Sequence, residues 1–188
     1  YNKLTAINIS DNRSLKSFSA VGNPFTMDAI DLSNNSNLEA FMIGGVSDVN
    51  GNYGTTTTLQ TASKTLEINT VRSNISSIDF SSNSRLNHLV VSDSKLEVFD
   101  INFISNVESL NLSGNYIESL SLEKFPSLEN LYLQRNSFSS LDVSSLSSLT
   151  LLIAVENNLT CVNVNENQLI NIPDSWILDS SVVFSLDC

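Results

Sequence analysis

The chain has 188 residues, enough for one elongated domain, and 41% of them are hydrophobic, an ordinary proportion for a folded protein that argues against disorder. Its formal net charge is −11, which argues against nucleic acid and anionic membranes as partners, because both attract a positively charged surface. The sequence has no long, uninterrupted apolar run, so it predicts no membrane-spanning helix.

The first part of the chain alternates between two kinds of short apolar segment. Front strands have the pattern L-x-x-L-x-L, and the first two centre on Phe18 and Phe41. Back segments lie between them and place an apolar pair, such as Ile30 and Leu32, on one side. Since alternate residues of a strand point in opposite directions, each apolar pair is predicted to face a core.

The pattern breaks at residues 47–64, which read SDVNGNYGTTTTLQTASK. The next front strand is predicted around Leu66 and Ile68. The step from Phe41 to Leu66 is only slightly longer than the spacing found later in the chain. We therefore interpret 47–64 as an enlarged back segment of one coil and not as an inserted domain.

Residues 107–159 are the most regular stretch. They contain VESLNLSGNYI, LENLYLQRNSF and LTLLIAVENNL, whose central residues Leu110, Leu131 and Leu152 are evenly spaced, since 131 − 110 and 152 − 131 both equal 21. A fixed period of about 20 residues is typical of stacked repeats, in which neighbouring strands form a parallel sheet over one core. Seven front strands are predicted, with centres at residues 18, 41, 66, 89, 110, 131 and 152.

An Asn follows several front strands where the chain must turn inward. Its amide both donates and accepts, so it is predicted to bond the turn backbone and the neighbouring coil. These residues are Asn23, Asn115, Asn136 and Asn157, while Val46, Val71 and Ser94 replace the Asn in the other coils.

The pattern L-x-x-L-x-L-x-x-N-x-L, repeated with this period, resembles the leucine-rich-repeat proteins common on the surface of Bacteroidetes-type bacteria, whose repeats have the same length. The resemblance implies a right-handed, mostly β leucine-rich-repeat solenoid of about seven coils, with a parallel front sheet and short extended segments on its back. On this basis residues 1–158 form the solenoid, with 47–64 as its irregular segment, and residues 159–188 form a C-terminal cap.

Residues 159–188 carry the two cysteines of the chain, Cys161 and Cys188. An even pair at the end of a chain otherwise free of cysteine predicts one disulfide, and therefore an oxidising compartment, in preference to two buried thiols. The motif LTC, a later Trp and a closing FSLDC resemble the cap of this repeat family. Four residues are expected to cover the end of the core: Trp176, Ile177, Val183 and Phe184.

His88 is the only histidine. A Ser-His-Asp arrangement can be assembled from Ser109, His88 and Asp93, but no nucleophile elbow or oxyanion feature accompanies it, so a surface histidine is favoured. The sequence contains neither a second histidine nor a cysteine cluster, and it predicts no transition-metal site, no cofactor and no enzyme.

Four aspartates recur at the outward position of the back segments. They are predicted to stack as an acidic row, which is interpreted as a solvated face, with Ca²⁺ binding as the alternative. The four are Asp31, Asp79, Asp100 and Asp142.

The outward side of the front sheet is the candidate binding surface, because solenoids bind partners there. An apolar centre with a polar rim is typical of a protein-binding patch, while the preference of β-branched residues for strands is an equally weighted explanation. The candidate residues are Tyr132, Ile153 and Val155, rimmed by Glu129, Arg135 and Glu156, with His88 on the same face.

The sequence therefore predicts a secreted or cell-surface recognition module that binds protein or glycan through its concave front sheet. The alternatives are a structural spacer or cap of a larger surface protein and, third, a hydrolase that uses His88. The chain begins at Tyr1 already in repeat register, so we also expect self-association through an uncapped N-terminal end.

Overall fold

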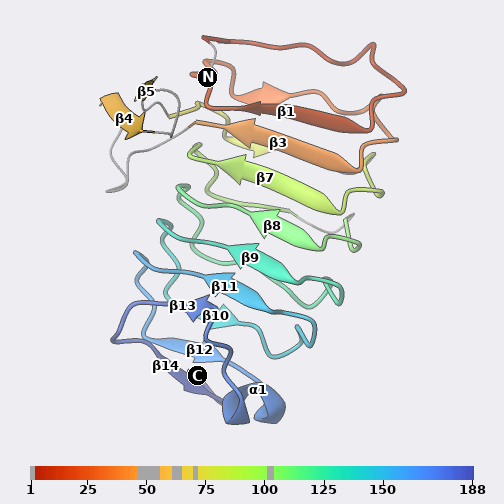
Figure 1. Ribbon diagram of the computed structural model, residues 1–188. Coiled ribbons are helices and arrows are strands. Elements are labelled where there is room, and N and C mark those ends of the chain that lie inside the picture. The colour runs from red at the N-terminus through yellow and green to blue at the C-terminus, as the bar shows by residue number, and fades with distance from the viewer. Residues whose placement is uncertain (1–2, 46–55, 61–64, 70–71, 101–103) are drawn as a thin grey trace.

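A seven-stranded parallel sheet forms the front of the molecule (Figure 1). The structure is a computed structural model that describes residues 3–45, 56–60, 65–69, 72–100 and 104–188. Along the sheet the strands are β1 (Ser17–Val21), β3 (Ala40–Gly44), β7 (His88–Ser92), β8 (Ser109–Asn111), β9 (Asn130–Tyr132), β11 (Leu151–Ile153) and β13 (Trp176–Ile177). The predicted parallel-sheet solenoid is confirmed.

The register of this sheet aligns the apolar positions of successive coils. Leu89, Leu110, Leu131 and Leu152 lie opposite one another, each one repeat from the next, and all four are fully buried. They form a row through the core, and burial of each Leu side chain contributes about 2 kcal/mol of transfer free energy. The repeat therefore stabilises the fold by stacking equivalent side chains.

Short extended segments form the back, as predicted. β2 (Ala29–Ile30) pairs with β6 (Ser77–Ile78), and β10 (Leu141–Asp142), β12 (Cys161–Asn163) and β14 (Val183–Ser185) form a parallel three-stranded sheet. No helix among the described residues is long and apolar enough to cross a membrane.

The predicted front strand around Leu66 and Ile68 is wrong. β3 pairs directly with β7, so Phe41 lies opposite Leu89, more than two repeats later in the sequence. β5 (Thr65–Asn69) pairs instead with β4 (Thr56–Gln60), antiparallel, in a separate two-stranded sheet. Of residues 47–64, the structure describes only β4. Alternating apolar residues identified a strand correctly but did not identify the sheet that it joins.

The chain leaves the solenoid and returns to it at one point. The N–H groups of Gly45 and Ser73 both donate to the carbonyl oxygen of Asp93, at 3.2 and 2.9 Å. If the intervening residues 46–72 are left out of the count, the step from Phe41 to its partner Leu89 becomes the regular step of the repeat. Residues 46–72 are therefore an insertion in one coil.

The predicted asparagine row is confirmed where the structure describes it. Asn115 Nδ2 donates to the carbonyls of Val91 and Leu112, at 2.7 and 2.9 Å, and its Oδ1 accepts from the N–H of Leu96 at 3.0 Å. Each amide thus joins its own turn to the preceding coil. Corresponding bonds are made by Asn23, Asn136 and Asn157, whereas Val46 and Val71 lie outside the described residues.

A second asparagine row, which the sequence analysis missed, lies at the back turns. Asn35 and Asn83 are fully buried, and Asn83 Nδ2 donates to the carbonyl of Asn35 at 2.9 Å. Asn35 Nδ2 in turn donates to the carbonyl of Asn12 at 3.0 Å. These amides occupy the position that Ile104 takes in the following coil, one repeat after Asn83. The back turns therefore change from polar to apolar packing along the stack.

The cap is a further coil closed by the predicted disulfide between Cys161 and Cys188. It contains the short helix α1 (Glu166–Ile170), which was not predicted; its N-terminus is held by reciprocal hydrogen bonds between Asn165 and Gln168. This capping box satisfies two backbone N–H groups that the first turn of the helix leaves free.

Two of the four expected cap residues cover the core. Trp176 lies opposite Leu152 and is 7% exposed, and the ring of Phe184 packs 5.9 Å from it. The prediction is wrong for Ile177 and Val183, which are 50% and 57% exposed. Since Trp176 and Ile177 are neighbours in one strand, they point to opposite sides of the sheet.

Candidate functional site

The structure places an apolar surface on the outward side of the front sheet, towards the C-terminal end. Register puts Tyr132, Ile153 and Ile177 side by side on β9, β11 and β13. Leu151, Ile153 and Val155 are two residues apart from one another in and just after β11, so their side chains point to the same side of the sheet. All three are half-buried. We call Tyr132, Leu151, Ile153, Val155 and Ile177 the apolar patch. Ile177 is an addition to the predicted residues of this surface, because its sequence position predicted that it would cover the core.

Negative charge surrounds the apolar patch. Glu129, one residue before β9, and Glu156, three residues after β11, are both exposed. The N–H of Glu156 donates to Asp179 Oδ2 at 2.9 Å, which adds another carboxylate on this side. Residues 136–188 contain six acidic residues and no Lys, Arg or His. The C-terminal part of the solenoid therefore carries an excess of negative charge.

Arg135 is turned towards the preceding coils. Its Nη2 lies 3.4 Å from Asp93 Oδ1, and the two side chains are 22% and 9% exposed. Gly114 lies between them in the same column, since 114 − 93 and 135 − 114 both equal 21. The structure therefore pairs Arg135 with a carboxylate of the solenoid and leaves little of its side chain available to a partner.

His88 is exposed at the start of β7, opposite Ser109. Asp93 follows the other end of β7, about 16 Å away along an extended strand, and pairs with Arg135. The three side chains of the Ser-His-Asp alternative therefore do not converge. His88 also lies two strands from Tyr132, at about 10 Å, so it is not part of the apolar patch.

The acidic row on the back has a structural role. Asp31, Asp79 and Asp142 each accept a hydrogen bond from the N–H of the Ser two residues later, at 2.8–2.9 Å. This arrangement is an Asx turn, which ends each back segment. Among the described residues, no group of three or more His, Cys, Asp or Glu side chains is arranged to hold a metal ion.

The same hydrogen bonds stabilise the ionised carboxylates. Bonds from the following serines lower the pKa of Asp31 and of Asp79. Burial raises the pKa of Asp142, but hydrogen bonds from Ser144 and Asn163 outweigh burial, so this pKa is also lowered. These three aspartates are therefore ionised at neutral pH.

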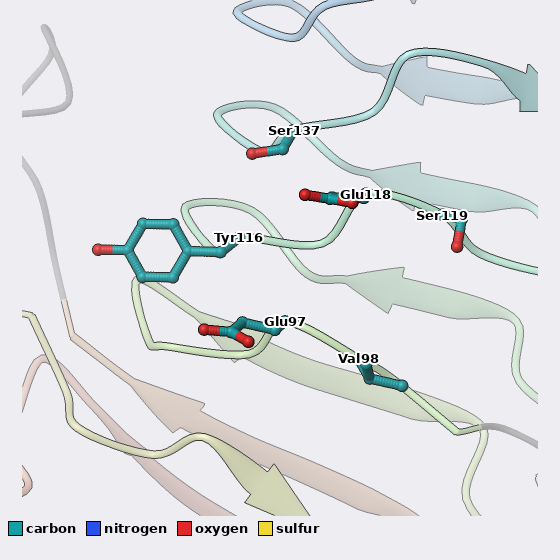
Figure 2. A pocket seen from close by; sticks show the side chains of 6 residues that line it. All are labelled: Glu97, Val98, Tyr116, Glu118, Ser119 and Ser137. Carbon is teal, nitrogen blue, oxygen red and sulfur yellow. The ribbon is translucent and has the colours of Figure 1, made fainter.

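A pocket of about 660 Å³ opens on the flank, between the ends of the front strands and the back segments (Figure 2). The ring of Tyr116, 44% exposed, projects from its wall, and the guanidinium of Arg72 lies 4.6 Å from the ring centroid. This site, which we call the flank pocket, lies outside the front-face columns in which the sequence predicts binding residues. It is lined by Glu97, Val98, Tyr116, Glu118, Ser119 and Ser137.

No family model matches the sequence, and no curated protein matches it. Among solved structures, the chain is similar to the functional domain of InlJ from Listeria monocytogenes, which includes a cysteine ladder. The TM-score is 0.63 and the identity 15%, and the match covers 97% of this chain and 37% of that one. Here the two cysteines form the cap disulfide, and asparagines form the rows. The likeness shows the fold: this chain is a leucine-rich-repeat solenoid of about six turns.

Proposed function

We propose that the chain is a non-catalytic recognition module that binds a protein through the apolar patch of its front sheet. The observation that carries the proposal is the alignment of Tyr132, Ile153 and Ile177 on three neighbouring strands. An apolar centre surrounded by charged residues is the usual anatomy of a protein-binding surface. The fold supports it, since solenoids present such surfaces on their sheets.

The composition of the patch distinguishes binding from simple strand preference. β-Branched residues favour strands, which explains Ile153 and Val155 without any partner. It explains Ile177 as well, which is 50% exposed on the last strand of the sheet, but not Leu151, which is neither β-branched nor aromatic and is half-buried on the outward side of β11. Contact of these side chains with water costs free energy that a partner would recover, at about 25 cal/mol per Å² of apolar area.

The charge around the patch specifies the partner further. Glu129 and Glu156 are exposed beside it, and Arg135, the basic residue in the turn after β9, is paired with Asp93. The partner is therefore a protein segment with an apolar residue flanked by Lys or Arg. Complementary charge of this kind accelerates association and excludes acidic competitors.

A displayed library of random peptides tests this proposal. Peptides are selected on the oxidised wild-type chain and counter-selected on a Tyr132→Ala/Ile153→Ser variant, with Met42→Ala as matched control because Met42 lies in the same outward column on β3. We expect basic peptides with an apolar anchor that bind the wild type and Met42→Ala equally. Peptides that bind all three proteins equally would contradict the site, and enrichment only on glycan arrays would favour the glycan alternative.

We propose further that the module works outside the cell or on its surface. The disulfide between Cys161 and Cys188 supports an oxidising compartment, since such bonds are rare in reducing ones. Alkylation of free thiols in the natively produced protein, followed by mass measurement, tests this. Modification of both cysteines without prior reduction would contradict it.

A structural spacer within a larger surface protein is the second candidate function. At the N-terminal end Leu4 is 39% exposed, and Leu15 and Phe18 are only partly buried. The chain also spans 37% of the length of the similar InlJ domain. As a spacer, the chain would contact further coils or a second copy of itself through its N-terminal end. Residues 1–158 would form the solenoid and residues 159–188 its cap. Sedimentation at increasing concentration distinguishes a monomer from self-association, with Phe18→Ser as the variant expected to abolish it.

A further inference from the structure

We propose that the flank pocket is a second binding site and that it takes an organic cation, a guanidinium or ammonium group. The pocket lies on the side of the solenoid, away from the outward column of the front sheet, and the proposal does not depend on the apolar patch. Four features carry it: two carboxylates in equivalent positions, an aromatic ring that already contacts a guanidinium, an exposed apolar side chain, and the size of the cavity.

The two carboxylates come from equivalent positions of neighbouring coils. Glu97 and Glu118 are separated by one step of the repeat, since 118 − 97 equals 21, so about 5 Å separates their backbones. Figure 2 shows both carboxylates directed to the same side as the Tyr116 ring. Like charges at equivalent positions of adjacent coils repel each other, and a cation bound by both carboxylates would offset the repulsion.

These glutamates differ from the aspartates that have a structural role in the solenoid. Asp142 ends a back segment through its serine hydrogen bonds, and Asp93 pairs with Arg135. Within the part of the chain that the structure describes, neither Glu97 nor Glu118 forms a side-chain hydrogen bond or ion pair, and no Lys or Arg lines the pocket. Their charges therefore remain available to a ligand.

The ring of Tyr116 shows which chemistry it accepts. Arg72 places its guanidinium 4.6 Å from the ring centroid, within the range of a cation–π contact, while Arg72 Nη1 donates to the carbonyl of Ser94 at 2.7 Å. Tyr116 is nevertheless 44% exposed and lines the pocket. The ring therefore remains accessible to a second cation.

The remaining lining suits a cation on a flexible stem. Val98 is 78% exposed and offers an apolar contact for the methylene groups of a Lys, Arg or polyamine chain. The hydroxyl groups of Ser119 and Ser137 accept hydrogen bonds from its N–H groups. The volume of about 660 Å³ lies in the range of ligand sites, and the net charge of −11 raises the local concentration of cations.

Titration of the oxidised, ¹⁵N-labelled chain with N-acetyl-arginine methylamide, followed by backbone amide shifts, tests the site. We expect saturable shifts centred on Val98, Tyr116 and Ser119, and none with the neutral isostere N-acetyl-citrulline methylamide. Glu97→Gln/Glu118→Gln should weaken binding at least tenfold. The charge-matched control, Glu108→Gln/Glu123→Gln, removes two exposed acids elsewhere and should change it less than twofold.

Two further probes identify the source of the cation. Tighter binding of spermidine than of an Arg-Gly-Arg peptide assigns the site to a free polyamine, and the reverse order assigns it to a basic side chain of a partner protein. Either order supports the proposal. Equal weakening by the two double variants, equal binding of citrulline and arginine derivatives, or the lack of saturable shifts would overturn it.

Discussion

The guanidinium of Arg135 reaches across Gly114 to the carboxylate of Asp93, with Nη2 3.4 Å from Oδ1, although the two residues are two repeats apart in sequence. All three residues have left-handed backbone conformations, with φ of 58°, 68° and 46° respectively. A Cβ at position 114 would collide with the Asp93 carboxylate. One glycine therefore serves both the turn of its own coil and the ion pair between its neighbours.

Replacement of Gly114 by Ala should lower the free energy of unfolding by about 2 kcal/mol, because Ala is strained at this φ and its methyl group displaces the carboxylate. Denaturant unfolding measures the loss. Asp93→Asn keeps a residue that tolerates the left-handed conformation while it removes the charge. If the ion pair passes over Gly114, the double variant should lose less unfolding free energy than the sum of the losses of the two single variants. A loss equal to that sum would contradict this relationship.

Asn115→Ala should destabilise the chain by about 3 kcal/mol, since it leaves the N–H of Leu96 and the carbonyls of Val91 and Leu112 without their buried partner. Thermal and denaturant unfolding give the value. The control is Asn158→Ala, an exposed Asn beside the row, which should cost less than about 0.5 kcal/mol. Equal costs would show that the row does not hold the coils together.

Deletion of residues 46–72 should leave the solenoid folded, because Gly45 and Ser73 already bond the same carbonyl of Asp93. The join restores the regular repeat step between Phe41 and its partner Leu89 on β7. Circular dichroism and amide spectra of residues 104–188 should match the full chain, with loss of the Arg72–Tyr116 contact as the local change. Loss of cooperative unfolding would mean that the insertion is part of the core.

Acid should weaken the back turn at Asp142. Its pKa is lower in the folded chain than the ordinary 3.8, so its contribution to stability is present above pH 3.8 and is lost as the pH falls through the folded-state pKa. Asp142→Asn removes the charge but keeps an acceptor for Ser144. At pH 7 this variant should be less stable by about 0.5 kcal/mol, since the site is exposed, and at pH 2 the difference should vanish. A difference that persists at pH 2 would contradict the assignment.

The repeat period predicted the parallel sheet because it depends on residues that every coil repeats. It failed at Leu66, since local alternation cannot show which strand a segment joins. The sequence contains a better signal for the return of the chain. Ser73 and Ile75 lie one repeat before Ser94 and Leu96, so the two pairs occupy equivalent turns of neighbouring coils. That spacing identifies the return of the chain after the insertion.

The alternation of side chains along a strand could have corrected the prediction for the cap. Trp176 and Ile177 are neighbours in one strand, so they cannot both face the core. Trp176 lies inward, which leaves Ile177 to the front surface. The pairing of Arg135 with Asp93 had no such signal. It depends on left-handed conformations at both residues and on the glycine between them, which sequence periodicity alone does not reveal.

The central claim is recognition through the apolar patch, and calorimetry of one selected basic–apolar peptide tests it most directly. The titration compares the wild-type chain with Tyr132→Ala on β9 and with Met42→Ala on β3 of the same column. We predict at least a tenfold loss of affinity for Tyr132→Ala, about 1.4 kcal/mol, and no change for Met42→Ala. Equal affinity for all three proteins, with unfolding transitions unchanged, would contradict the account.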